Sequence, residues 1–452
     1  MRRSILFALI LSTACVDRAK PAVSLYEKGD YAGAARVADE ALKAHPDDDG
    51  LWAMRIRAAL AQGDGDGVAR AYASYAGHRG ELDKDLLREL AIATLGQALA
   101  SPSAKLKIAA IDAVEASELE ALADQVSERL GDDNDRVAAS AAIAILHGYP
   151  VQAAPVADQL LKSEDPEARR IILDGLGKKV GKLAIADLER GGSDNDARVR
   201  RVALRWLGIL KDADAVELLT KRTRDADDGV RAIAFDALAN LNIGDLAALG
   251  KQALADKSFA VRSAGVDLYA AAHREDLLVA TTDDADPLVA LAAAIAVHKR
   301  PELARKAIDR AIASTEWTVR AGAANSLVQA LGKEAALPIA GQLAHDSVLG
   351  VRLAAARVLA HAGDRKTAAE VFAAAPDDIQ AVADLADLGD PRGIEGLGTA
   401  VRDPKRTADQ RAEAAAAHRA AHRVTPGLVA ALADQSGLVR VAAAATLAAL
   451  SK

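Results

Sequence analysis

Apolar residues recur along most of this chain at the spacing of one face of an α-helix. In the stretch DDGVRAIAFDAL, which begins at residue 227, apolar side chains stand at Val230 and then three, four, seven and eight residues later. This spacing gathers them into one wide stripe on a helix. A turn and a second helical stretch follow each such segment, as at residues 301–313. The pattern therefore predicts a repeating helix–turn–helix unit of about 30 residues.

The unit recurs with a nearly constant period. The residue that opens the apolar stripe, called the anchor here, returns at an interval of 31 residues five times in succession. The anchors at this interval are Leu106, Val137, Ala168, Val199, Val230 and Val261. Further anchors are Val289, Val319, Val351 and Val439, with weaker copies near Ile379 and Gln410. Because one such unit cannot bury its stripe alone, we expect about twelve units to stack over residues 101–452.

Two polar features recur at fixed positions relative to the anchors. A short oxygen-bearing side chain, such as Asp194 or Asp225, stands five residues before the anchor, and we expect it to cap the helix. At Ser101 the next residue, Pro102, is expected to be the first residue of its helix. An arginine directly follows many anchors, at Arg200, Arg231, Arg262, Arg320, Arg352 and Arg440. Because we expect each arginine to face the acidic cap of a neighbouring repeat, the pattern predicts a ladder of exposed ion pairs between repeats rather than a ligand site.

These features resemble the HEAT-like repeat family in its short bacterial form, whose signature is D-x-x-x-x-V-R-x-x-A-x-x-A-L. The resemblance covers residues 101–452 and departs from the signature at Ala138, Ala290 and Gln380, where the arginine is replaced. It implies an all-α fold, a right-handed α-solenoid of helix–turn–helix repeats.

A different repeat is expected before the solenoid. The segment beginning at Tyr26 resembles the tetratricopeptide (TPR) family, on the residues Tyr31, Ala34, Ala38, Ala41, Leu42 and Pro46. The pair Gly29-Asp30 recurs 34 residues later as Gly63-Asp64, which is that family's period. The expected order is a signal peptide at 1–14, about two TPR-like repeats within 15–80, a connecting helix at 81–100 and the HEAT-like solenoid at 101–452.

The first residues have the pattern of an export signal. Arg2 and Arg3 precede an apolar run over residues 5–11 that is too short to span a bilayer. Thr13 and Ala14 then precede Cys15, the one cysteine of the chain. This arrangement resembles the lipoprotein signal of bacteria, which implies cleavage before Cys15 and a diacylglycerol on its sulfur.

The cysteine count supports lipid attachment, because a lone thiol in an exported chain cannot form an internal disulfide. The alternative is an ordinary signal peptide in which Cys15 is incidental. Val16 follows the cysteine, and in Gram-negative relatives a residue other than Asp there implies the outer membrane. The expected location is therefore the bacterial cell envelope, as an outer-membrane lipoprotein facing the periplasm.

Composition and charge exclude several classes of function. The net charge of −7 comes from 57 basic and 64 acidic residues that are well mixed, so a nucleic-acid partner is not expected. Residues 63–67, GDGDG, resemble a calcium loop, but Val68 occupies the fifth ligand position. His418 and His422 have a metal-ligand spacing without the glutamate of a metalloprotease motif. No cofactor, metal site or catalytic residue is expected.

The sequence favours a lipid-anchored, non-catalytic scaffold that binds a protein or peptide on its concave face, which we expect the second helices to form. Charged residues of those helices are the candidate partner-binding set: Glu217, Lys221, Arg222, Lys251, Arg305 and Arg310. One alternative is an enzyme accessory or lyase, since short HEAT-like repeats resemble those of bilin lyases. Another is a component of envelope assembly or cargo handling.

Overall fold

The structure is a computed structural model that describes residues 16–297 and 300–452. Helices, turns and loops make up these residues, and no strand occurs among them. The chain forms two compact units, residues 1–129 together with 372–452 (unit 1) and residues 130–371 (unit 2). In the described part of the chain, no helix has both the length and the apolar character needed to cross a membrane.

Unit 1 takes its helices from both ends of the chain. From the N-terminal part come α1(Val16–Glu27), α2(Tyr31–Ala44), α3(Asp49–Ala61), α4(Gly65–Arg79), α5(Lys84–Leu99), α6(Ala104–Ser117) and α7(Ala123–Ser127), with 3₁₀ turns at Glu120–Leu122 and Glu128–Gly131. From the C-terminal part come α24(Ile379–Asp387), α25(Pro391–Ala400), α26(Ala408–Ala417), α27(Pro426–Ala430), the 3₁₀ turn Ala431–Ala433 and α28(Gly437–Leu450).

Unit 2 alternates a first helix, which carries the anchor, with a second helix. The first helices are α8(Asp135–Ile145), α10(Pro166–Lys179), α12(Ala197–Leu210), α14(Asp228–Leu241), α16(Phe259–Ala271), α18(Pro287–Ala296), α20(Trp317–Leu331) and α22(Leu349–Ala362). The second helices are α9(Pro150–Leu160), α11(Ile185–Gly191), α13(Val216–Arg222), α15(Leu246–Leu254), α17(Glu275–Thr281), α19(Pro301–Ile312) and α21(Lys333–Leu343), and α23(Arg365–Ala373) lies at the boundary. Turns of 3₁₀ type at Gly181–Ala184 and Ala213–Ala215 precede α11 and α13.

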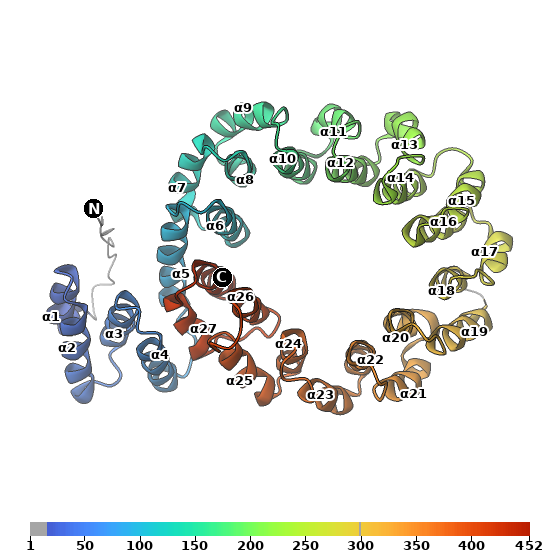
Figure 1. Ribbon diagram of the computed structural model, residues 1–452. Coiled ribbons are helices and arrows are strands. Elements are labelled where there is room, and N and C mark those ends of the chain that lie inside the picture. The colour runs from blue at the N-terminus through green and yellow to red at the C-terminus, as the bar shows by residue number, and fades with distance from the viewer. Residues whose placement is uncertain (1–15, 298–299) are drawn as a thin grey trace. The chain divides into compact units, whose positions relative to one another are not determined.

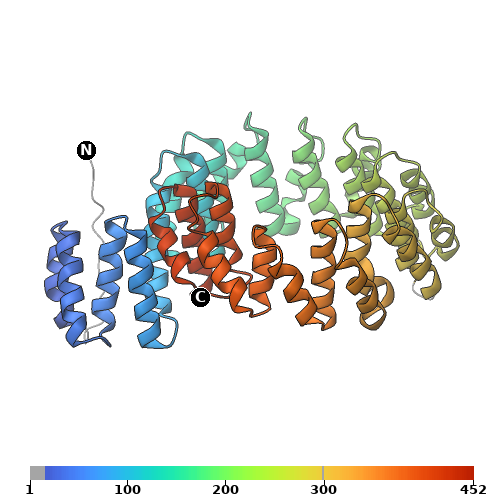
Figure 2. The same ribbon diagram turned by 60° about the horizontal axis from the view of Figure 1, so that its bottom comes forward.

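The two kinds of helix form two layers in unit 2, and the layers are the reverse of the expected ones. The first helices line the inner side of the curved unit and the second helices lie on its outer side (Figure 1). Seen from a second direction, the helices stand side by side along the unit (Figure 2). The expectation that the second helices form the concave face is therefore wrong. Apolar periodicity shows which side chains are buried between the layers, but not toward which layer the unit curves.

Most first helices begin closer to the anchor than the sequence predicted. The N-cap lies three residues before the anchor, as at Asp196 and Asp227, whose side chains accept backbone N–H groups of the first turn. The acid five residues before the anchor lies in the preceding turn, where Asp225 accepts the N–H of Asp227 at 3.0 Å. The expected start at Pro102 is likewise wrong, because α6 begins at Ala104 with Ser103 as its N-cap.

The GDGDG stretch is the end of a turn and the start of α4. Gly63 has a positive φ of 69°, which glycine tolerates without strain, and the Asp64 side chain caps α4 by accepting the N–H of Gly67. Gly29 (φ 82°) and Asp30 repeat this arrangement at the start of α2. The 34-residue recurrence is thus a recurring turn and cap, while its assignment to the TPR family stays a prediction.

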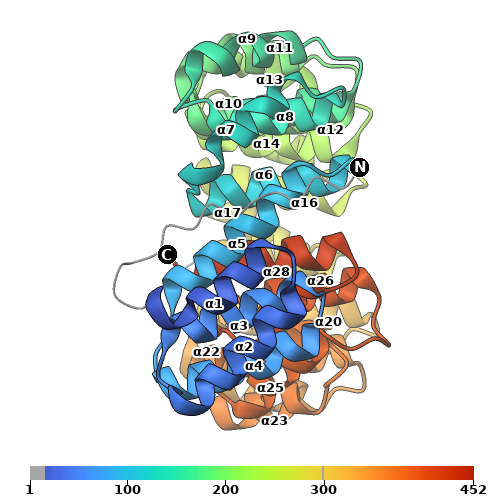
Figure 3. The ribbon, with the colours of Figure 1, turned by 90° about the vertical axis from the view of Figure 1, so that its left-hand side faces the viewer.

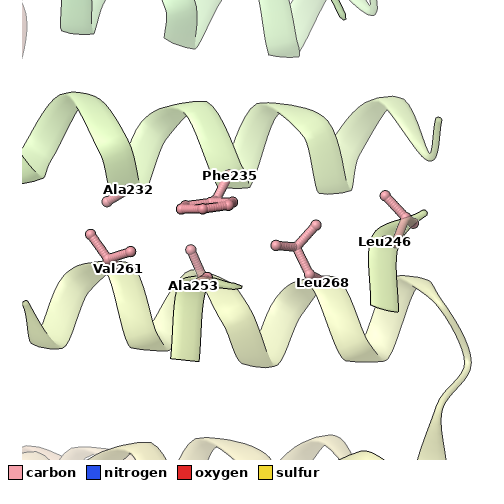
Figure 4. Close-up of a cluster of buried hydrophobic side chains, with 7 residues drawn as sticks. Ala232, Phe235, Leu246, Ala253, Val261 and Leu268 are labelled. Atoms are coloured by element: carbon pink, nitrogen blue, oxygen red, sulfur yellow. The ribbon is translucent and has the colours of Figure 1, made fainter. Parts of the chain in front are cut away.

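The core of unit 2 lies between neighbouring repeats. Phe235 of α14, 1% exposed, faces Val261 and Leu268 of α16, which are fully buried, and Ala253 of α15 completes the contact (Figure 4). Burying a side chain such as Phe235 contributes about 1.5–3 kcal/mol relative to its exposure. Each repeat thus buries its apolar stripe on the next one, as the periodic pattern predicted.

The C-terminal helices of unit 1 pack on its N-terminal helices. Helix α28 lies against α26 on one side and against α5 and α6 on the other (Figure 3). Helix α27 packs on α4. Ala443, Ala444 and Leu447 of α28 are fully buried as a result. At the edge of this contact Lys84 Nζ donates to the backbone oxygen of Lys452 at 2.6 Å. The last helix of the chain is therefore an internal helix of unit 1.

Candidate functional site

The arginine that follows an anchor joins one repeat to the next. Arg231 donates through Nη1 to the carbonyl oxygens of Asp225 and Ala226, at 2.9 and 3.2 Å, in the turn before its own helix. Through Nε and Nη2 it binds the carboxylate of Asp256, the turn acid of the next repeat, at 2.8 and 2.9 Å. These hydrogen bonds hold the pKa of Asp256 below its usual value.

The predicted ladder of ion pairs is present, but its rungs are less exposed than expected. Arg231 is only 9% exposed, and equivalent pairs join other repeats. They are Arg169–Asp194, Arg200–Asp225, Arg320–Asp346 and, in unit 1, Arg411–Asp434. Arg262 also pairs with the next repeat, but with its N-cap Asp286 instead of the turn acid. The rungs at Arg169 and Arg411 were missed, although each directly follows a predicted anchor. Arg352 and Arg440 bind the carbonyl oxygens of their own turns.

Three of the six candidate partner-binding residues come together in one groove of unit 2. Glu217, Lys221 and Arg222 of α13 line a groove of about 1100 Å³ together with two turns of the ladder. Its remaining lining residues are Ser193, Asp194, Asn195, Arg200, Thr220, Arg224, Asp225 and Ala226. This set, called the α13 groove below, is open to solvent and rich in charge.

Arg222 is the most constrained cation of the α13 groove. Its side chain is 18% exposed, its Nε donates to the carbonyl oxygen of Gly192 at 2.8 Å, and its Nη1 lies 3.2 Å from the Asp225 carboxylate. Asp225 also accepts from Arg200 at 2.7 Å, and its side chain is only 3% exposed. One buried carboxylate therefore serves two guanidinium groups.

The two exposed cations of the groove have no acidic partner. Lys221 and Arg224 are exposed, and neither forms an ion pair with a described residue. Glu217 lies four residues before Lys221, a spacing that often gives an ion pair on a helix, yet the two do not form one in the described structure. These three side chains are available to a partner.

The structure separates the other three candidates from the groove. Lys251 lies on α15 and is exposed. Arg305 on α19 binds Asp309 one turn further along its own helix, at 2.9 Å. Arg310 donates to the carbonyl oxygens of Asp284 and Ala285, at 2.7 and 3.0 Å, and so takes part in packing the neighbouring repeat. A role of these residues in binding stays a prediction.

An acidic residue on the inner helices was not singled out from the sequence. Asp236 of α14 stands six residues after its anchor, and burial raises its pKa to about 6, with a further contribution from Asp267 of α16. In the preceding repeat the equivalent residue is Arg205, which pairs with Asp174 at 2.6 Å. The signal for Asp236 was an acid six residues after the anchor, which recurs in other repeats at Asp112, Asp174 and Asp267.

In the histidine pair with metal-ligand spacing, the first histidine is bound within the protein. His418 is fully buried, its Nδ1 donates to the carbonyl oxygen of Ala414 at 2.8 Å, and its Nε2 accepts the hydroxyl of Thr425 at 2.9 Å. Both ring nitrogens are thus engaged within the protein. Among the described residues, no group of three or more His, Cys, Asp or Glu side chains is placed to hold a metal ion. The predicted lipidation site, Cys15, lies outside the described residues.

Comparison with solved structures finds other chains of low sequence identity. An engineered protein is 19% identical, with a TM-score of 0.29, over 79% of this chain and 98% of its own. A mutant of Kap121p is 12% identical, with a TM-score of 0.30, over 90% of this chain and 49% of its own. Kap121p bound to Nup53p is 12% identical, with a TM-score of 0.29, over 89% of this chain and 49% of its own. The present chain thus spans about half the length of the Kap121p structures.

Sequence comparison identifies the repeat itself. A search of curated proteins finds no match. A family model described as HEAT repeats matches residues 153–239, which run from α9 to α14. The helix pairs continue on both sides of this segment, and the arginine ladder continues on its C-terminal side. The predicted all-α fold of stacked helix pairs is confirmed, and residues 153–239 are HEAT-like repeats.

Proposed function

We propose that this protein is a non-catalytic scaffold that binds a protein partner through the outer second helices of unit 2. The observation that carries the proposal is the α13 groove, where Glu217, Lys221 and Arg224 are exposed and unpaired. The ladder cations, by contrast, are bound within the protein, as Arg231 is by Asp256. HEAT-like repeats offer extended surfaces of this kind to protein partners.

The anchoring of the scaffold is a separate part of the proposal. Cys15 follows a short apolar run and two small residues, which supports its lipidation and a location at the outer membrane, facing the periplasm. The lipid would hold the repeats close to the membrane without a membrane-spanning helix of their own.

Chemical crosslinking on intact membranes, with partners identified by mass spectrometry, tests the scaffold role. We expect the wild type to capture a defined set of proteins and a Glu217→Lys/Lys221→Glu double variant to lose at least one of them. This double variant keeps the net charge of the protein, so the loss of a captured partner would show that binding depends on the local arrangement of charge. A captured set that stays unchanged in this variant and in charge reversals along α15 and α19 would contradict binding by the second helices.

A further inference from the structure

Arg222 stands at a position that other repeats of unit 2 give to small or apolar residues. It lies three residues before the turn acid Asp225. The residues three before the equivalent turn positions are buried and uncharged: Leu160, Gly191, Ala253, Thr281, Ala311 and Leu343. A guanidinium therefore replaces a core side chain in this repeat. An arginine also stands three residues before the turn acid Asp132, at Arg129 of unit 1, where it pairs with Glu128 at 3.0 Å and is 25% exposed. Departures from a protein's own local rule are expected at functional sites.

The arginine brings positive charge that the groove does not neutralise. Four cations line the groove, Arg200, Lys221, Arg222 and Arg224, against the three acids Asp194, Glu217 and Asp225. Asp194 is bound at 2.8 Å by Arg169, which is not part of the lining. Asp225 is shared by two arginines. The groove is therefore locally basic in a chain whose net charge is −7.

The cations are placed to bind carboxylate groups. Arg222 is fixed by its bonds to Gly192 and Asp225, while its Nη2 donates to no described residue. Lys221 and Arg224 lie on either side of it in the chain and are exposed. A charge-assisted hydrogen bond to a guanidinium that is already held in place costs little ordering of that side chain.

We propose that the α13 groove binds an acidic segment of a protein partner, with Arg222, Lys221 and Arg224 receiving its carboxylates. This inference rests on the proposed scaffold function and specifies the partner's chemistry. A volume of about 1100 Å³ is large for a single small anion and suits several residues of a peptide. The lining has no aromatic side chain on which a nucleobase could stack, which favours a peptide over a nucleic acid.

Fluorescence polarisation with the purified protein and a labelled peptide of alternating Glu and Ala tests the inference. We expect saturable binding to the wild type that weakens as salt is raised. Arg222→Ala restores the kind of residue that other repeats carry and should fold normally by circular dichroism. It should weaken binding roughly tenfold, which corresponds to one lost charge-assisted contact, and Lys221→Glu should weaken binding by at least as much.

Lys333→Glu is the matched control, because Lys333 begins α21, is exposed, forms no ion pair with a described residue, and undergoes the same change of charge. The inference fails if the wild type does not bind the peptide saturably, or if Lys333→Glu weakens binding as much as Lys221→Glu. It also fails if a peptide with Gln in place of Glu competes equally, or if inorganic phosphate displaces the peptide at a lower concentration than unlabelled peptide does. Membrane crosslinking separates the two proposals: partners captured by wild type and Arg222→Ala alike would leave the scaffold role standing and exclude this groove.

Discussion

At the scale of single residues, Arg231 shows how burial changes the contribution of an ion pair to stability. The sequence predicts an exposed pair, for which removal costs about 0–1 kcal/mol. In the structure Arg231 is 9% exposed and binds two carbonyl oxygens as well as Asp256. Removing it leaves these acceptors without their donor. We expect Arg231→Ala to lower the free energy of unfolding by about 2–3 kcal/mol in urea titrations.

The comparison that isolates this effect is Arg198→Ala. Arg198 pairs at 2.9 Å with Asp196, but its side chain is 58% exposed and the pair lies within one repeat. Its loss should leave the free energy of unfolding almost unchanged, because the pair is exposed to solvent. Equal losses for the two variants would mean that the bonds between repeats contribute nothing beyond surface charge.

Asp236 gives a prediction about pH. Burial raises its pKa to about 6, above the usual value of 3.8, so the folded protein binds the proton more tightly than the unfolded chain does. Stability associated with this group is therefore greatest at low pH and is lost as pH rises from about 4 through 6. Asp236→Asn should be more stable than the wild type at pH 7, by on the order of 1 kcal/mol after allowing for partial solvent exposure, and the difference should shrink below pH 5.

Urea unfolding of both proteins between pH 4 and pH 8 measures this difference. A gap between the two curves that stays constant across this range would show that the carboxylate of Asp236 has an ordinary pKa in the folded state. Asp214→Asn serves as the reference, because Asp214 is exposed and its carboxylate forms no ion pair in the described structure.

The role of a residue was predictable where the same residue type recurs at the same position in many repeats. The Val-Arg anchors and the acid five residues earlier appear often enough to predict the ladder. The same repetition misplaced the helix start by two residues, because Asp225 and Asp227 are both acids that can accept from a free N–H. Arg222 was chosen as an exposed charge, but its contact with Asp225 could not be predicted, since it depends on how two turns meet in space.

At the scale of elements, helix α28 links the two ends of the chain within unit 1. Ala444 is fully buried, with 0% of its surface exposed to solvent, whereas the adjacent Ala445 is half-buried. A glutamate at Ala444 would place an unpaired charge among apolar groups, at a cost of several kcal/mol. We expect Ala444→Glu to release α28 and to speed hydrogen exchange in the amides of α5 (Lys84–Leu99).

Ala445→Glu is the control, because a glutamate at a half-buried position can extend its carboxylate to water. Exchange in α5 should then resemble that of the wild type. If Ala444→Glu leaves α5 protected as well, the packing of α28 on α5 does not stabilise unit 1.

The existence of the helices was the most predictable property of the fold, since a spacing of three and four residues recurs in nearly every repeat. Two properties of the elements were not predictable in the same way. The pattern does not say which helix layer lies on the inner side of unit 2. It also contains no local sign that α28 packs on α5, because that contact joins segments more than 330 residues apart in sequence.

At the scale of the whole molecule, the proposed attachment to a membrane depends on one residue. Cys15 is the one cysteine in the chain, so a thioether-linked lipid can form nowhere else. Two or three acyl chains hold a protein firmly, whereas one chain binds weakly and reversibly. We expect the wild type to remain with membranes in high salt and to be released by detergent, and Cys15→Ser to be found in the aqueous fraction.

Two further measurements make this outcome specific to the lipid. Mass spectrometry of the wild type should show an N-terminal peptide that begins at Cys15 and carries the mass of the lipid, while Cys15→Ser should retain residues 1–14. Because Cys15 precedes α1, the first described helix, circular dichroism and the peptide binding of the α13 groove should be the same in the two proteins. A wild type that stays with membranes without any lipid on Cys15 would instead be held there by a protein partner, and the repeats themselves would then determine its location.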